Sequence, residues 1–211
     1  MAAVTAGQLP TVRLGEAAPD VILPGAGERL SAACARGFVA LVLLPSDPAA
    51  AAAVKRSVAG VQAKGSLAGT VVEMIGPAQE EARRAFFGSR AEAVAGAMVL
   101  LIDRSRVLRR VSNLPADALE STGPHLADLF ESFQSGKLAY ESACARCHGT
   151  DGKNRDYAGI KSLGGVGNRL TLQQITERFR AVPLGDGTFS VRTCILTRKG
   201  VESLAHYVAG L

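Results

Sequence analysis

The chain has 211 residues, of which 47% are hydrophobic and 20% charged, and its formal net charge is +5. This composition excludes an intrinsically disordered chain, and the length allows one large domain or two small ones, each with its own core. No run of 18 apolar residues occurs, so the sequence predicts no transmembrane helix.

The first 113 residues alternate predicted strands and helices. Strands are predicted from the apolar or β-branched runs at 38–44, 69–76, 97–103 and 107–113. A helix over 48–64 is predicted from a cap at Ser46 or Asp47, Pro48 in the first turn and the alanines that follow. A second helix is predicted over 77–89, where Pro77 starts it and acids precede bases. The resulting order, β-α-β-α-β-β, predicts a compact α/β sheet.

This order, preceded by GEAAPD at 15–20 and containing the strand LLID at 100–103, resembles the peroxiredoxin and thioredoxin-like family over residues 11–113. The resemblance implies a thioredoxin-like α/β domain at 1–116. In that family a reactive cysteine follows the first buried strand, but here residues 45–54 read PSDPAAAAAV, and Cys34 precedes the strand. The family's proline before the later strand is also missing. The peroxidase and disulfide chemistry of that family needs a thiolate nucleophile, which is missing from the expected place. We therefore expect a structural or docking domain.

Residues 117–133 are predicted as a linker helix that carries the domain boundary. Leu119, Leu126, Leu129 and Phe130 have helical spacing, and the Gly-Pro pair at 123–124 predicts a restart of the helix at Pro124.

The remaining segment, 134–211, reads as helices joined by loops. Helical spacing leads up to residue 144, a second helix is predicted over 171–182 behind a Thr171 cap, and a third over 195–211 behind a Thr197 cap. The segment also holds the whole charge excess. Residues 1–134 contain 13 Lys/Arg and 13 Asp/Glu, whereas residues 135–211 contain 11 Lys/Arg and 6 Asp/Glu, a net charge of +5. Such a segment attracts acidic partners, and without an aromatic-basic platform we expect no nucleic-acid partner.

The most informative motif is CARCHG at 144–149. Two cysteines three residues apart, followed at once by a histidine, form the pattern by which c-type haem is attached. The two thiols reach the two vinyl groups of one porphyrin, and His148 then projects toward the iron. A zinc site would need a second ligand pair, for which only Cys194 and His206 are available. A thioredoxin-like redox pair would follow a strand, whereas a helix is predicted before this motif.

The surroundings of the motif resemble class I cytochrome c over residues 134–211. That family has Gly-x-x-x-aromatic-x-x-x-Cys before CxxCHG and Leu-x-x-Tyr on a last helix that packs across the first. The corresponding residues here are Gly136, Tyr140, Cys144, Cys147, His148, Leu204 and Tyr207. The resemblance implies an all-α cytochrome c domain with one covalent haem c. It implies Cys144 and Cys147 as attachment residues, His148 as proximal iron ligand and Tyr140 in the cofactor site.

Further features of the haem site remain open at this stage. Arg169, with Arg155 and Lys161, is a candidate for neutralising the haem propionates, and the alternative is that all three are solvated loop charges. The family's proline after the motif is missing from YAGIKSL at 157–163, so another backbone carbonyl must orient His148.

The sixth iron ligand is also open. Electron-transfer members of the family usually supply a methionine after the motif, but Met1, Met74 and Met98 all precede it. We therefore predict that the site is not His/Met unless Met74 or Met98 arrives from the first domain.

Four alternatives are considered for this position: a vacant or water-bound site, Cys194, His125 and His206. Cys194 lies nearest the expected loop, and its thiolate would lower the reduction potential, although a small buried cysteine is the competing interpretation. His125 could reach the iron only if the first domain covered the haem face. His206 is more typical of a surface or packing residue.

The expected function is one-electron transfer through the haem, within or docked to a redox complex that has an acidic docking surface. Two alternatives stay open: a haem enzyme or a gas- or peroxide-binding protein with a vacant iron position, and a structural subunit with a non-essential haem. Haem attachment implies the periplasm or an equivalent exported compartment. The first 20 residues contain no basic region followed by an apolar one.

Overall fold

The computed structural model describes residues 11–88, 96–153, 161–179, 181–184, 188–191 and 194–211. The chain divides into two compact units, Met1–Asp128 and Leu129–Leu211.

The first unit is built on a four-stranded sheet in the order β2-β1-β3-β4. The β1 and β2 strands are parallel, and the β1–β3 and β3–β4 pairs are antiparallel. Its elements in chain order are α1 (Leu30–Arg36), β1 (Phe38–Leu43), α2 (Pro48–Ala63), β2 (Thr70–Ile75), α3 (Glu80–Phe87), β3 (Ala97–Ile102), β4 (Leu108–Leu114) and the 3₁₀ helix η2 (Ala116–Ser121). The predicted β-α-β-α-β-β order is confirmed, and the resemblance to the thioredoxin-like family stays a prediction.

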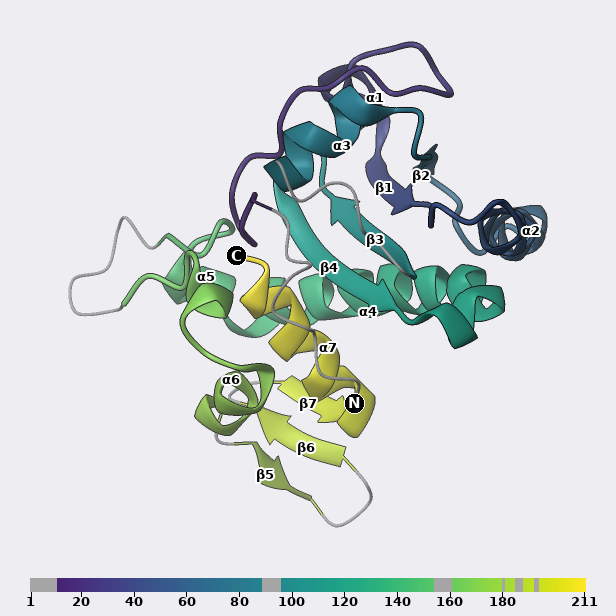
Figure 1. The fold of residues 1–211 in the computed structure, drawn as a ribbon. Coiled ribbons are helices and arrows are strands. Elements are labelled where there is room, and N and C mark those ends of the chain that lie inside the picture. Colours follow the sequence, from purple (N-terminus) through teal and green to yellow (C-terminus); the bar gives the residue numbers. More distant parts are fainter. Residues whose placement is uncertain (1–10, 89–95, 154–160, 180, 185–187, 192–193) are drawn as a thin grey trace. The chain divides into compact units, whose positions relative to one another are not determined.

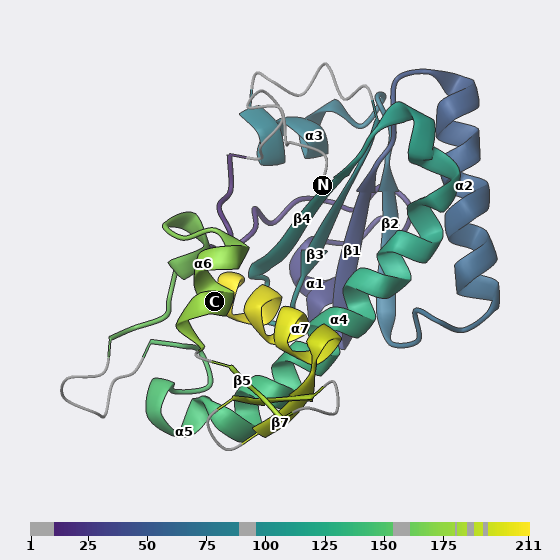
Figure 2. The same ribbon diagram turned by 90° about the horizontal axis from the view of Figure 1, so that it is seen from below.

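The central strands β1 and β3 are apolar throughout because both faces of the sheet are covered (Figure 1). One face packs against α1 and α3, where Phe86 and Leu30 are fully buried with Leu41 and Leu100. The α2 helix lies on the other side and buries its valines (Figure 2). Continuous apolar runs are typical of such doubly covered strands.

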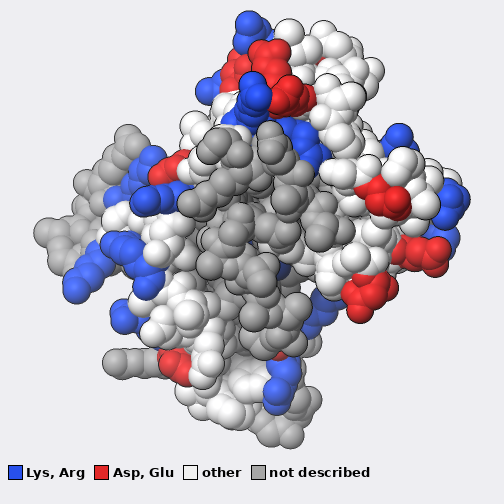
Figure 3. All heavy atoms as spheres, in the orientation of Figure 1, with Lys and Arg blue, Asp and Glu red and all other residues white. Residues whose placement is uncertain are grey.

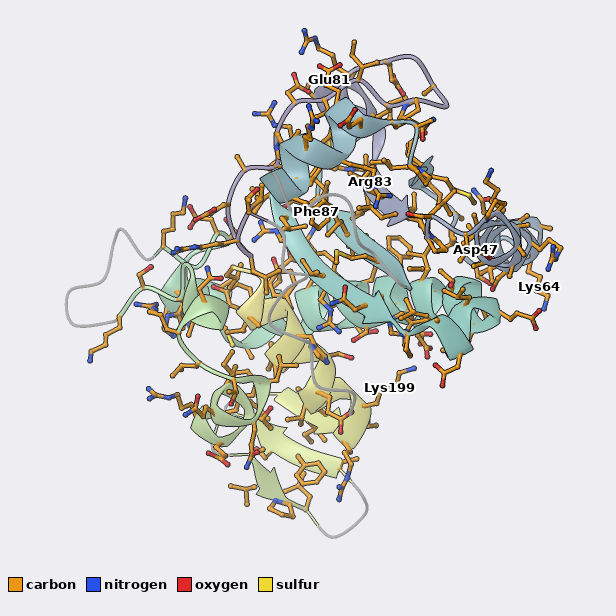
Figure 4. All side chains as sticks on the ribbon, in the orientation of Figure 1. Asp47, Lys64, Glu81, Arg83, Phe87 and Lys199 are labelled. Atoms are coloured by element: carbon orange, nitrogen blue, oxygen red, sulfur yellow. The ribbon has the colours of Figure 1, made fainter. Side chains whose placement is uncertain are left out.

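Local signals account for the helix starts in this unit. The Asp47 side chain accepts a hydrogen bond from the Ala50 amide at 2.7 Å, which caps α2 as predicted. The α3 helix begins at Glu80, three residues later than predicted, because Gln79 first closes a turn with Gly76 through its side chain at 2.6 Å. The buried Arg83 of α3 points inward and donates to the Leu44 carbonyl at 3.1 Å (Figure 4).

The second unit contains the end of α4 (Thr122–Ala143), a helix that runs without a break from Thr122 and carries Pro124 in its first turn. The predicted linker helix at 117–133 is thus divided: residues 117–121 belong to η2, and the rest forms one helix with the predicted first helix of the haem segment. The other elements in chain order are α5 (Ala145–His148), the 3₁₀ helix η3 (Val166–Asn168), α6 (Leu172–Arg178), β5 (Val182–Pro183), β6 (Thr188–Val191), β7 (Cys194–Thr197) and α7 (Arg198–Ala209).

The expected all-α fold of residues 134–211 is wrong. The unit contains a three-stranded antiparallel sheet in the order β5-β6-β7, and the fold is mixed α/β. The predicted helix from 171 ends at Arg178, and residues 195–197, predicted as the start of the last helix, belong to β7 (Cys194–Thr197). The physical reason lies in the β-branched Thr188, Val191 and Ile195, whose side chains fit a pleated sheet better than a helix.

The register of this sheet separates a covered face from an exposed one. Phe189 pairs with Leu196. On this face α7 lies close to Leu196, because a Cβ added to Gly200 of α7 would be 3.3 Å from the Leu196 Cβ. On the opposite face, Val182 and Ile195 pair with the same residue of β6, Ser190, and they are 58% and 69% exposed.

Candidate functional site

The CARCHG motif forms a single helical turn that continues from the end of α4. Cys144 departs from helical geometry with φ −121° and ψ −35°, and α5 begins at the next residue. The amides of Cys147 and His148 both donate to the Cys144 carbonyl, at 3.1 and 2.9 Å. The Gly149 amide donates to Ala145 at 2.8 Å. These backbone hydrogen bonds place Cys144, Cys147 and His148 on one helical turn.

The side chains of this turn differ in exposure. Cys144 is 8% exposed, whereas Cys147 and His148 are partly exposed. Both cysteines are thiols, with no disulfide between them. A turn that carries two thiols and an imidazole within five residues has the donor set needed to attach a porphyrin at two points and ligate its iron.

Tyr140 lies one turn before the motif and is fully buried. Its hydroxyl donates to the Gly149 carbonyl at 2.7 Å, and its ring packs on Tyr207 of α7 with centroids 5.2 Å apart. Burial raises the pKa of Tyr140, so the hydroxyl stays protonated and remains a donor.

The α4 and α7 helices cross in close contact at Gly136. A Cβ there would lie 2.1 Å from the Ser203 carbonyl oxygen and 2.9 Å from the Tyr207 Cβ, so only glycine permits this approach. The Ser132 and Ser203 hydroxyls are 3.1 Å apart, and the Phe133 ring lies 5.1 Å from that of Tyr207. The structure thus brings together Gly136, Tyr140 and Tyr207, the residues singled out before and after the motif.

The remaining cofactor candidate, Arg169, lies just after η3 and is exposed. Its guanidinium donates to the Gly164 carbonyl at 3.2 Å. Lys161 is also exposed, and Arg155 lies outside the described residues. The exposure of Arg169 and Lys161 fits solvated loop charges.

Each candidate for the sixth ligand has a defined place in the chain. Cys194 opens β7 opposite Val191, and its side chain is not among those described. His125 belongs to the first unit, where its Nε2 lies 2.6 Å from the Ser112 hydroxyl. Burial and the nearby Arg110 lower the pKa of His125. His206 lies on α7, and its buried Nδ1 has no hydrogen-bond partner in the described part of the chain.

The methionines do not supply a ligand within the second unit. Met98 is fully buried in β3 and Met74 is partly buried in β2, both in the first unit. Met1 lies outside the described residues.

Exposed charged side chains flank the motif along the chain, with the acids Glu141 and Asp151 among them. Arg146 and Lys153 are exposed on either side of His148, and Arg169 and Arg178 are exposed after η3 and on α6. Figure 3 shows blue Lys and Arg atoms outnumbering red ones around α5. Lys199 of α7, labelled in Figure 4, lies 3.6 Å from the Glu131 carboxylate.

Sequence reasoning missed the bond between the Tyr140 hydroxyl and Gly149. Helical spacing predicted that Tyr140 shares a helix face with Gly136 and Cys144. The hydrogen-bond partner of its hydroxyl depends on how the chain turns after His148, which the spacing does not predict. A tyrosine in place of a purely apolar aromatic residue was the available signal, since a buried phenol needs a hydrogen-bond partner.

No protein-family model matches the sequence, and no curated protein matches it either. Among the residues with described positions, no three His, Cys, Asp or Glu side chains form a metal site. No helix in that part of the chain is both long and apolar enough to span a bilayer.

Proposed function

We propose that the second unit covalently binds one c-type haem and transfers single electrons. The observation that carries this proposal is the Cys144–His148 turn, which presents two thiols and an imidazole in one backbone-bonded unit. The helix crossing at Gly136 supports it, because it fixes the end of α4 from which this turn projects.

The residues present fit the group by the chemistry of their side chains. Cys144 and Cys147 would hold the porphyrin through thioethers, and His148 would bind the iron. A bound haem supplies a ferric/ferrous couple that accepts and releases one electron. The chain's own part is to exclude water from Cys144, to orient His148 through the α5 backbone and to present an exposed basic surface beside the motif.

The proposal has a direct test in the absorption spectrum of the oxidised and reduced full-length protein, produced where haem ligation operates. We expect haem to copurify in a ratio of about one per chain and to remain attached under denaturing conditions. Cys144→Ala/Cys147→Ala should abolish covalent attachment, and Cys34→Ala, which removes a thiol from the first unit, is the matched control. Protein without haem absorbance contradicts the proposal.

A second candidate is binding of a small ligand at a vacant iron position. The observation that favours it is the lack of any methionine after residue 98, so the second unit has no thioether ligand of its own. Reduced protein whose spectrum shifts with CO supports this candidate. A spectrum that ignores CO supports a six-coordinate electron carrier instead.

The partner we propose is a redox protein with an acidic surface, which would meet the exposed arginines and lysines near α5. Electron exchange with such a partner should slow steeply as ionic strength rises. We propose further that the first unit serves docking within a redox complex and that the protein works in an exported compartment, where haem attachment takes place.

A further inference from the structure

Tyr140 contacts both ends of the helical turn from Cys144 to His148. Its backbone carbonyl accepts a hydrogen bond from the Cys144 amide at 2.8 Å, and its side-chain hydroxyl donates to the Gly149 carbonyl at 2.7 Å. The turn from Cys144 to His148 lies between these two bonds. A single residue therefore spans the segment that carries both thiols and the imidazole.

Gly149 is held through its amide, which donates to the Ala145 carbonyl at 2.8 Å, and through its carbonyl, which accepts from Tyr140. Gly149 leaves the helix with φ 73° and ψ 160°, a conformation that favours glycine. Its carbonyl also accepts the Gly152 amide, but at 3.2 Å, so the bond from Tyr140 is the shorter one. Removal of that bond leaves the Gly149 carbonyl with the longer contact from Gly152, while the Gly149 amide keeps its bond to Ala145.

The Tyr140 ring has a fixed support of its own. It is completely buried and packs on Tyr207 of α7, which lies against the α4 backbone at Gly136. Because the ring is already fixed, its hydroxyl loses little additional conformational entropy when it forms a hydrogen bond. The fixed hydroxyl in turn restrains the Gly149 carbonyl that accepts from it.

We infer that Tyr140 is a positioning residue whose hydroxyl holds His148 in its iron-ligating orientation by fixing Gly149, the residue that follows it. This inference rests on the proposed haem function. It goes beyond that function by assigning the stability of the His148–iron bond to one phenol group that makes no bond to the iron.

The test compares Tyr140→Phe with the unsubstituted protein and with Ser142→Ala. The first change removes the hydroxyl and keeps the ring on Tyr207. The second removes an exposed hydroxyl bond to Leu138 in the same last turn of α4 and serves as the control. Amide hydrogen exchange, resolved by residue, and acid titration of the haem spectrum are measured on all three proteins.

For Tyr140→Phe we expect about tenfold faster exchange at the His148, Gly149 and Gly152 amides, the loss of one hydrogen bond's worth of local stability. The α7 amides should keep their protection. The pH at which His148 leaves the iron should rise by roughly half a unit, because a mobile imidazole is protonated more readily. Ser142→Ala should change neither quantity.

Two outcomes overturn the inference: unchanged exchange at 148–152 with an unchanged acid transition, or equal loss of protection throughout α7, which would mean general packing. Failure of the proposed function is read separately, as unsubstituted protein without covalent haem. In that event faster exchange in Tyr140→Phe would establish a purely structural bond, and the ligand-positioning role would fall with the haem.

Discussion

The two units differ in how they complete their cores. The first buries both faces of a four-stranded sheet, and one large hydrophobic side chain among its described residues, Ile22, is notably exposed, at 58%. The second has 83 residues and a three-stranded sheet of short strands. Its described part leaves five large hydrophobic side chains exposed: Leu138, Leu172, Val182, Leu184 and Ile195. Both units bury a core, but among the described residues the second leaves more large hydrophobic side chains exposed, and it is only slightly above the size at which small domains need a cross-link or prosthetic group.

The largest expected effect comes from Gly136→Val, at the helix crossing of the second unit. The added side chain would overlap the Ser203 carbonyl, a backbone atom that cannot move without displacing α7. We expect a loss of about 3 kcal/mol or more in the unfolding free energy of this unit. Denaturant unfolding followed by haem absorbance for the second unit and by hydrogen exchange for the first should show only the second destabilised.

The matched control is Gly60→Ala in α2 of the first unit. A Cβ there meets nothing within 4 Å, and the residue lies inside a regular helix. Alanine should therefore stabilise the first unit by about 0.4–1 kcal/mol. A Gly136→Val protein as stable as the unsubstituted one would show that the two helices need not approach so closely.

The next effect concerns the cofactor rather than the packing. If the proposed haem completes the second core, Cys144→Ala/Cys147→Ala should lower the denaturant midpoint of the second unit and leave the first unchanged. Hydrogen exchange on full-length protein with and without attached haem measures both at once. Equal midpoints with and without haem would mean that the second unit completes its core unaided.

The same contrast explains what the sequence predicts well. The β1 and β3 strands are long apolar runs buried on both faces, and the α2 cap at Asp47 is local, so these elements follow from nearby residues. The β5 strand has two residues, and β6 and β7 have four each, too few for a periodicity to separate strand from helix. The Cys144–His148 turn is equally local, and its residues follow directly from the motif CARCH. The Tyr140–Gly149 hydrogen bond depends on tertiary folding, so it cannot be predicted from neighbouring residues.

A smaller effect is expected from His125 in the first unit. Burial and Arg110 of β4 lower its pKa below 6.5, and Asp128 on its own helix opposes this only in part. The folded state therefore resists protonation of His125. The contribution of His125 to the unfolding free energy is complete above pH 6.5 and is lost as the pH falls toward the folded pKa. The unfolding free energy of the first unit should decline in this range, and His125→Gln should flatten the decline. An unaltered slope would assign the acid sensitivity to other groups.

The smallest effect is on the alkaline side and concerns Cys34, which is 1% exposed. Burial and the nearby Asp103 raise the pKa of its thiol from 9.0 to about 11. The folded state holds this proton more tightly than the unfolded chain does. The contribution of Cys34 to the unfolding free energy is therefore full below pH 9 and is lost as the pH rises toward 11.

The raised pKa also predicts slow alkylation of Cys34. At pH 8 only about one molecule in a thousand carries the thiolate, so alkylation should be far slower than at the partly exposed Cys147 of haem-free protein. Mass spectrometry of the alkylated peptides compares the two rates in one sample. Equal rates would mean that burial in the first unit does not protect Cys34, and that its thiol is as accessible to the reagent as the partly exposed Cys147.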